Sequence, residues 1–168
     1  ETYLPAFRDL VQEGKAASVM SAYNRVNGDS ATASQRLLND ILRKEWGFDG
    51  YVVSDCGAVD DIFMRHKLVA TAEEASALAV VRGCDLECGS SYRSLGKALE
   101  RGLLKEEDLD VAVRRLMLAR MQLGMFDPPE RVAYARIPYA VNDAPEHDRL
   151  ARRVAQESIV LLKNDGVL

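Results

Sequence analysis

"GFDGYVVSDCGAV" (residues 47–59) contains the feature on which the fold prediction depends, a short apolar run that ends in a carboxylate. Residues 51–53 form the run, and Ser54, Asp55 and Cys56 follow it directly. An apolar run of this length between glycines indicates a buried β-strand. Burying an ionised carboxylate costs free energy unless neighbouring groups compensate, so Asp55 needs a structural or chemical reason.

Outward from this stretch, strand and helix patterns alternate along the chain. We predict strands over residues 16–23, 50–54 and 84–87, and helices over 34–46 and 71–82. This order is typical of βαβ units, in which parallel strands are joined by right-handed crossovers. Ser34 is the expected cap of the first helix, whose apolar residues fall at helical spacing, and Thr71 with Glu74 forms a capping box at the start of the second. We expect a polar loop over 24–33 and a loop before Thr71, where Asp60 and Asp61 are interpreted as loop or helix-start capping.

The predicted strands end at a regular interval, near Tyr23, Asp55 and Glu87, each 32 positions after the one before. This step is typical of consecutive units of a (β/α)₈ TIM-like barrel. A doubly wound open sheet is the competing architecture, but no glycine-rich dinucleotide fingerprint follows any of the strands. Three strands cannot close a barrel, and both ends of the chain resemble interrupted elements, so we expect a fragment of a longer protein.

The remaining segments predict helices, a linker and the start of a second domain. A helix ended by Gly14 precedes the first strand, and the pattern is helical again from residue 91. Residues 125–147 hold four of the five prolines, which indicates an irregular connection. We therefore predict barrel residues with trailing helices over 1–124, a linker over 125–144, and a second domain beginning over 145–168 with a helix and an apolar strand, "SIVLLKN".

Composition and charge exclude some classes of partner. The chain has 168 residues and a net charge of −4, from 22 basic and 26 acidic residues. No excess of cations is available for phosphate backbones, so a nucleic-acid partner is not expected. The basic pair Arg114-Arg115 follows Asp110 at a spacing that predicts surface ion pairs on a helix. No apolar run approaches the roughly 18 residues needed to cross a bilayer, so no membrane partner is expected either.

The candidate functional residues lie where the predicted strands end, because barrel enzymes build their sites there. They are Met20, Tyr23 and Asn24, then Ser54, Asp55 and Cys56, then Asp85, Glu87 and Cys88. From the residues alone, Asp55 serves as a nucleophile, a general base or a metal ligand, or it only caps the turn at Gly57. The two histidines, His66 and His147, lack zinc-site spacing, so we predict no metal and no cofactor.

Several blocks of sequence carry a family resemblance. "GFDGYVVSDCGAV", "VMSAYNRVNG", "ILRKEWG" and "ESIVLLKNDGVL" resemble family 3 of the glycoside hydrolases, in its β-xylosidase-like branch. The resemblance implies that the chain holds the last three βα units of the barrel and leads into an α/β sandwich domain. It also implies that Asp55 is the nucleophile, that Met20 and Tyr23 line the sugar pocket, and that the acid/base is a glutamate beyond residue 168.

The same resemblance implies a role for the cysteines. The glucosidase branch has tryptophan after the nucleophile, whereas the β-xylosidase-like branch has a cysteine paired with the one in a block that is "DLECG" here. This implies a bridge between Cys56 and Cys88, with Cys84 as the free thiol; the alternative is that all three thiols are reduced and buried. A bridge in that place would leave room for a pentose and exclude a hexose CH₂OH group.

The expected function is that of a retaining, exo-acting β-xylosidase that releases xylose from xylo-oligosaccharides. The alternatives are a β-glucosidase or an α-L-arabinofuranosidase of the same family, or a scaffold fragment that is inactive in isolation. The expected partners are the oligosaccharide and the remaining parts of the same polypeptide, in a periplasmic or secreted location. A Tyr23 hydroxyl next to Asp55 is the expected donor to it, and Asp85 and Glu87 are interpreted as structural or loop-anchoring.

Overall fold

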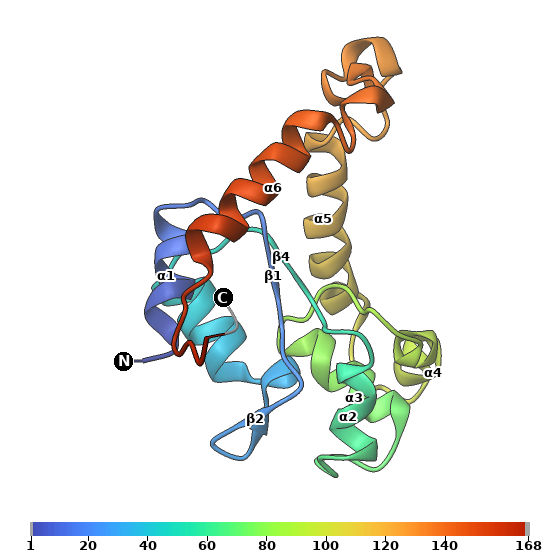
Figure 1. Ribbon diagram of the computed structural model, residues 1–168. Helices are drawn as coiled ribbons and strands as arrows, with labels where there is room; N and C mark the ends of the chain where they lie inside the picture. Colours follow the sequence, from blue (N-terminus) through green and yellow to red (C-terminus); the bar gives the residue numbers. More distant parts are fainter. Residues whose placement is uncertain (1, 167–168) are drawn as a thin grey trace. The chain divides into compact units, whose positions relative to one another are not determined.

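The computed structural model describes residues 2–166, which fall into two units, one up to Phe126 and one from Asp127 onward. The strands of the first unit are β1 (Ser18–Met20), β2 (Arg25–Val26), β3 (Asp29–Ser30) and β4 (Tyr51–Val53). Its helices are α1 (Leu4–Gln12), η2 (Gln35–Glu45), α2 (Ala58–Met64), α3 (Ala72–Val81), α4 (Leu95–Glu100) and α5 (Glu106–Gln122), with 3₁₀ turns η1 (Ala31–Ala33) and η3 (Ser91–Ser94). Figure 1 shows this order along the chain.

The central strands are parallel, as predicted. β1 pairs with β4 in the register Ser18 to Tyr51 and Met20 to Val53, and they run side by side in Figure 1. A single parallel bridge joins Val53 to Leu86 on the next segment. The spatial order is therefore β1, β4, then Leu86, and the fragment is an α/β structure in which helices predominate. β1 and β4 are shorter than the strands predicted over 16–23 and 50–54.

The predicted third strand, 84–87, is wrong as a continuous strand, and its hydrogen bonds explain why. Two regular ladder bonds form, from Leu86 N–H to the Val52 carbonyl (3.0 Å) and from Ser54 N–H to the Leu86 carbonyl (2.8 Å). On either side of them, side-chain oxygens replace main-chain acceptors. The Asp85 carboxylate accepts from Val52 N–H at 2.8 Å, and the Ser54 hydroxyl accepts from Cys88 N–H at 3.0 Å. The regular ladder therefore ends at these two points, where side-chain oxygens take the place of main-chain carbonyls.

The two crossover helices begin where their caps were predicted. The Ser34 hydroxyl accepts from Leu37 N–H at the start of η2, which forms a π-helix rather than an α-helix. Its buried face consists of Leu38, Ile41 and Leu42. The capping box of α3 is confirmed, because Thr71 and Glu74 each bind the other's main-chain N–H. Such reciprocal bonds satisfy donors that a helix start would otherwise leave unpaired.

Two segments predicted as loops have regular structure. Residues 24–33 contain the antiparallel hairpin β2–β3, whose turn is Asn27-Gly28, both with positive φ. An Asn-Gly pair favours this turn because both positions tolerate left-handed backbone. Residues 58–64 form α2, with Asp60 and Asp61 in its first turn, where carboxylates interact favourably with the helix dipole.

The core of the first unit lies where β4 meets η2, α2 and α3. Its buried members include Leu38, Leu42, Phe48, Val52, Val59, Ile62, Ala75, Ala79 and Cys84. The chain enters β4 through Gly50, where a Cβ atom would lie 2.2 Å from the Ala17 carbonyl oxygen. Only glycine allows β1 and β4 to approach this closely at that point.

A buried ion cluster joins β4 to two helices. The Asp85 side chain, 1% exposed, pairs with Arg43 of η2 at 2.6 Å and with Arg115 of α5 at 2.7 Å. Burial lowers the pKa of Arg43, while the charge of Asp85 acts in the opposite direction. The prediction that the pair Arg114-Arg115 forms ion pairs with Asp110 on a solvated helix face is therefore wrong for Arg115. The long-range partner could not be seen from helical spacing.

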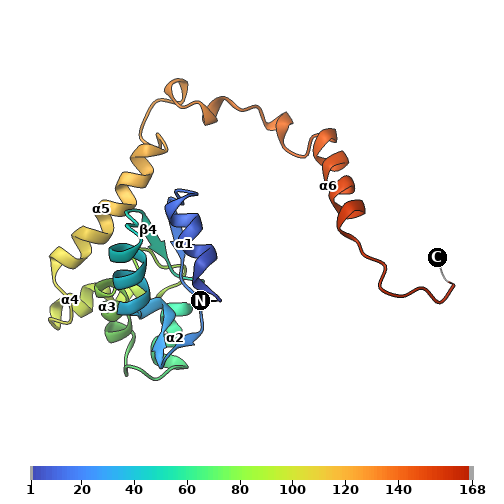
Figure 2. The same cartoon turned by 90° about the vertical axis from the view of Figure 1, so that its left-hand side faces the viewer.

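The second unit has 3₁₀ turns η4 (Pro129–Arg131), η5 (Tyr134–Arg136) and η6 (Tyr139–Val141), followed by α6 (Pro145–Ser158). The predicted strand "SIVLLKN" is wrong for the described residues, because the chain after α6 is extended without a ladder (Figure 2). A strand needs a neighbour for its main-chain groups, and none pairs with it within residues 2–166. Residues 159–162 are exposed. No helix described here is long and apolar enough to cross a membrane.

Candidate active site

The predicted site residues meet at the carboxyl ends of β1 and β4. Met20 is the last residue of β1 and lies opposite Val53, two positions before Asp55. The side chains of Met20 and Tyr23 are accessible, with 58% and 44% of each residue exposed, and Asp55 is half-buried. Because the strands are parallel, their carboxyl ends share one edge, and side chains from both strands face the same space.

Asp55 is held by the main chain and has no ion-pair partner within residues 2–166. One carboxylate oxygen, Oδ1, accepts from Cys56 N–H at 2.7 Å. The N-cap of α2 is Gly57, with φ of +81° and no side-chain cap, so Asp55 does not cap this helix. Asp55 therefore does not cap α2, and its contact with the turn at Gly57 is the bond from Cys56 N–H to Oδ1.

Tyr23 contacts both Asp55 and the residue after it. Its hydroxyl donates to the Cys56 carbonyl oxygen at 2.7 Å, so the expected donor to Asp55 is shared with the main chain. The pKa of Tyr23 is raised, chiefly by hydrogen bonding with the Asp55 carboxylate, with desolvation and the charge of Asp55 acting in the same direction. The raised pKa keeps this hydroxyl protonated and able to donate.

A disulfide stands directly beside Asp55. Cys56 and Cys88 are joined with an S–S distance of 2.00 Å and a Cα–Cα distance of 4.3 Å. Cys84 is free and buried, and burial raises the pKa of its thiol to about 12. The structure therefore contains the pair that the family resemblance implied, rather than three reduced cysteines.

The other carboxylates of this region are anchored elsewhere, as expected. Glu87 accepts main-chain N–H groups of Ser91 and Tyr92 at 2.8 Å and 2.6 Å, which holds the turn into η3. Asp85 is enclosed by Arg43 and Arg115. Glu87 therefore accepts two main-chain bonds and Asp85 is paired with two arginines, which supports the structural interpretation of both residues.

Ser54 is the residue whose role sequence reasoning missed. It is 1% exposed, and its hydroxyl accepts from Cys88 N–H in place of a main-chain carbonyl. A polar residue at the end of an apolar run, directly before a candidate nucleophile, was the only available signal. Its partner lies 34 positions away and could not be identified from spacing.

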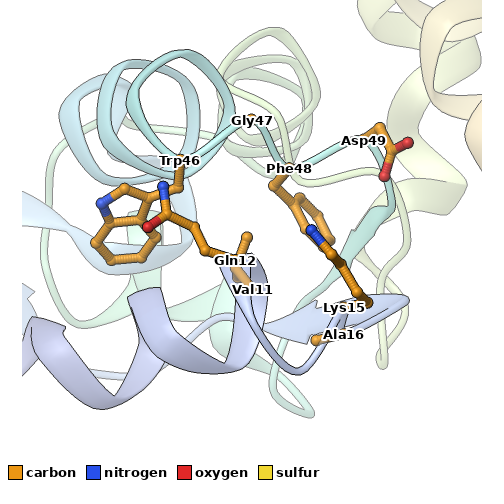
Figure 3. Close-up of a pocket in the computed structure, with 8 residues that line it drawn as sticks. All are labelled: Val11, Gln12, Lys15, Ala16, Trp46, Gly47, Phe48 and Asp49. Atoms are coloured by element: carbon orange, nitrogen blue, oxygen red, sulfur yellow. The ribbon is translucent and has the colours of Figure 1, made fainter.

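A pocket of about 400 Å³ lies at the opposite end of the strands, where α1 leads into β1 and η2 leads into β4. Figure 3 shows Trp46 and Gln12 on one side of it, and Phe48 and Lys15 on the other. Ala16 and Asp49, which also line it, precede β1 and β4 respectively. This pocket is therefore separate from the edge that carries Asp55.

Within the described residues, no group of three or more histidine, cysteine, aspartate or glutamate side chains could hold an ion. His66 lies in the first unit and His147 in the second. The arrangement at the strand ends offers one accessible carboxylate, one tyrosine hydroxyl and one disulfide.

Comparison with known proteins identifies relatives of the whole chain. It is 44% identical over 98% of its length to a xylan 1,4-beta-xylosidase of Xylanibacter ruminicola, of which it covers 19%. A solved GH3 exo-beta-xylosidase (XlnD) in complex with a xylobiose aziridine activity-based probe has a TM-score of 0.89 at 36% identity, over 99% of this chain and 22% of that one. A beta-glucosidase from Listeria innocua has a TM-score of 0.84 at 35% identity, over 98% and 23%.

The chain therefore spans about a fifth of the length of the relatives it matches. Residues 1–119 match the model of the glycosyl hydrolase family 3 N-terminal domain. This match covers more than half of the chain, and the relatives extend over nearly all of it. The chain belongs to glycosyl hydrolase family 3, as a fragment that includes part of the N-terminal domain.

Proposed function

We propose that this chain carries the nucleophile of a retaining, exo-acting β-xylosidase. The observation that carries the proposal is the position of Asp55, a half-buried carboxylate with no ion pair within residues 2–166, at the carboxyl end of a central parallel strand. β1, β4 and the segment at Leu86 would be the last three strands of a (β/α)₈ barrel, whose sites lie at this edge. The rest of the barrel and an α/β sandwich domain would come from other parts of the same polypeptide.

In the proposed reaction, the Asp55 carboxylate attacks the anomeric carbon of a terminal xylose. A carbon–oxygen bond to Asp55 forms while the glycosidic bond breaks, and its electron pair leaves with the departing oxygen, which an acid outside this chain protonates. Water, deprotonated by the same group, then displaces Asp55 and releases xylose with its configuration retained. The hydrogen bond from Cys56 N–H to Asp55 Oδ1 restricts the carboxylate, so little reorganisation precedes the attack.

The disulfide supports the choice of a pentose. The bridge between Cys56 and Cys88 occupies space beside Asp55, and we propose that this is where the CH₂OH group of a hexose would have to fit. Met20 and Tyr23 would line the same sugar subsite. A stable disulfide also favours an oxidising compartment, which supports a periplasmic or secreted location.

A β-glucosidase is the second candidate, because solved beta-glucosidases superpose on the chain with TM-scores near that of the xylosidase.

The test compares xyloside and glucoside hydrolysis by the longer protein that carries this chain. We expect the kcat/KM for the xyloside to exceed that for the glucoside by about 10- to 200-fold, the range that one excluded group provides. Equal values, or a glucoside preference, would contradict the xylosidase assignment. Detection of β-xylose as the first product, by NMR, checks retention.

A further inference from the structure

Ser54 is bonded to the neighbouring segment through both its main chain and its side chain. Its N–H donates to the Leu86 carbonyl at 2.8 Å, and its hydroxyl accepts from Cys88 N–H at 3.0 Å. In a regular parallel ladder, the main-chain carbonyl of this residue would accept the second bond. The hydroxyl therefore takes over a main-chain role at the position directly before Asp55.

These bonds belong to a closed frame around Asp55. Cys88 accepts from Gly57 N–H at 2.7 Å through its carbonyl and is joined to Cys56 through sulfur. Cys56 N–H, in turn, donates to Asp55 Oδ1 at 2.7 Å. The frame thus runs from Ser54 through Cys88 and Cys56 to the carboxylate. Ser54 and Cys56 are also the chain neighbours of Asp55, so the frame fixes it on both sides.

Replacing the carbonyl by a hydroxyl also allows the backbone to leave strand geometry at this position. The strand ends at Val53, and the Asp55 carbonyl already accepts from Ala58 N–H in the turn that leads to α2. If Cys88 N–H were bonded to the Ser54 carbonyl, the ladder would continue through the point where the chain turns. The hydroxyl keeps the two segments joined while the main chain diverges.

We propose that Ser54 is a positioning residue, whose hydroxyl holds Cys88 and the bridge to Cys56 so that the Asp55 carboxylate is fixed for attack. The proposal rests on the proposed function of Asp55. It assigns Ser54 no contact with substrate. Its effect is on the rate of the covalent step, which is sensitive to small displacements of the attacking atom.

The experiment compares two buried serines in the longer protein that carries this chain. Ser54 is 1% exposed and Ser76 of α3 is 0% exposed; the Ser76 hydroxyl donates to the carbonyls of Ala72 and Ser91 at 2.7 Å and 2.8 Å. Ser54→Ala and Ser76→Ala remove the same hydroxyl from equally buried sites. Labelling by a 2-fluoro-xyloside, which traps the covalent intermediate, is followed by intact mass below the melting temperature of each variant and normalised to folded protein.

We expect Ser54→Ala to lower the maximal labelling rate by roughly 10- to 100-fold, with a much smaller change in the reagent concentration for half-maximal rate. Ser76→Ala should lower the melting temperature but label within about twofold of wild type, because its hydroxyl bonds Ala72 and Ser91 and no member of the frame. Ser54→Thr, which retains the acceptor, should label faster than Ser54→Ala.

The outcomes separate two claims, the nucleophile role of Asp55 and the positioning role of Ser54. Absence of label on Asp55 in the wild-type protein would remove the proposed function itself. Label on wild-type Asp55 with an equal rate in Ser54→Ala would overturn the positioning role and leave the function intact. An equal loss of labelling rate in both alanine variants would also overturn the positioning role, because a general loosening of the fold would then explain the loss. A folded Ser54→Thr variant that labels as slowly as Ser54→Ala would overturn the positioning role as well.

Discussion

The two ends of β4 show opposite uses of an aspartate. At the amino end, Asp85 is 1% exposed, bonds Val52 N–H and pairs with two arginines. At the carboxyl end, Asp55 is half-buried, accepts one main-chain bond and has no ion pair within residues 2–166. At both ends a side-chain oxygen ends the regular ladder, from Asp85 at one and from Ser54 at the other.

The difference teaches how to separate a structural carboxylate from a reactive one. A fully paired, desolvated carboxylate stabilises the fold only because its partners are present, and removing it leaves buried charge. A carboxylate with free lone pairs at an accessible strand end can bond to a substrate carbon. The cysteines follow the same division, with Cys84 reduced and buried at the amino end and the bridge from Cys56 to Cys88 at the carboxyl end.

The largest effect is expected from Asp55→Ala in the longer protein. Loss of a nucleophile leaves no alternative route, so kcat should fall by roughly 10⁴- to 10⁶-fold, on the scale of other nucleophile deletions. The melting temperature should change little, because Asp55 has no ion pair within the described chain. Steady-state kinetics and thermal unfolding check this. Asp49→Ala, an exposed carboxylate at the other end of β4, is the control and should retain activity.

Asp85→Ala should show the opposite pattern from Asp55→Ala, with a large loss of stability and a smaller loss of kcat. The substitution leaves the guanidinium groups of Arg43 and Arg115 without their buried counter-charge, which costs about 3–5 kcal/mol of unfolding free energy. Denaturant unfolding measures it. The control is Asp40→Ala, which removes an exposed pair with Lys44 and should leave the unfolding midpoint nearly unchanged. A small loss for Asp85→Ala would mean that the cluster does not hold β4.

Opening the bridge should lower turnover, as the positioning role of the frame requires, and should also change sugar selectivity. Cys88→Ala removes one sulfur and frees the other, so a glucoside should fit better, and the xyloside preference should narrow by up to the roughly 1–3 kcal/mol that one excluded group is worth. Ratios of kcat/KM for the two aryl glycosides measure this. Cys84→Ala, at the far end of the strand segment, should leave the ratio unchanged. An unchanged ratio in Cys88→Ala would show that the bridge has no role in sugar choice.

The smallest effect concerns the buried thiol. Burial raises the pKa of Cys84 to about 12, against about 8.5 for a free thiol. The unfolded chain therefore loses this proton first, and the stability that comes from the protonated thiol is lost as the pH rises between those two values. Unfolding of wild type and Cys84→Ala at about pH 8 and pH 10.5 should show the steeper loss for wild type. Parallel slopes would contradict the burial effect.

Local patterns predicted most of the regular elements. The parallel order of residues 16–23 and 50–54, the crossover helices and the capping box at Thr71 all depend on periodicity and on groups within four positions of one another. The hairpin at Asn27-Gly28 had a usable turn signal that was interpreted as a loop. These features follow from short-range chemistry, which one sequence contains.

The replacement of main-chain acceptors by side-chain oxygens from distant segments could not be predicted from the sequence. The strand expected over 84–87 is reduced to one bridge because Asp85 and Ser54 supply side-chain acceptors from across the ladder. The pairing of Arg115 with Asp85 crosses 30 positions, a separation that helical spacing does not indicate. The predicted strand ends bring Met20 and Asp55 to one edge, but the bonds that hold Asp55 depend on the contact of β4 with residues 86–88.

Identification of the labelled residue tests the central claim most directly. After reaction with a 2-fluoro-xyloside and reduction, trypsin separates the two aspartates, because Asp55 lies in the peptide 45–65 and Asp85, with Glu87, lies in 83–93. The account predicts one sugar per molecule, in peptide 45–65, with fragmentation placing it on Asp55. A label in peptide 83–93, or on another residue of 45–65, would contradict the assignment of Asp55 as the nucleophile.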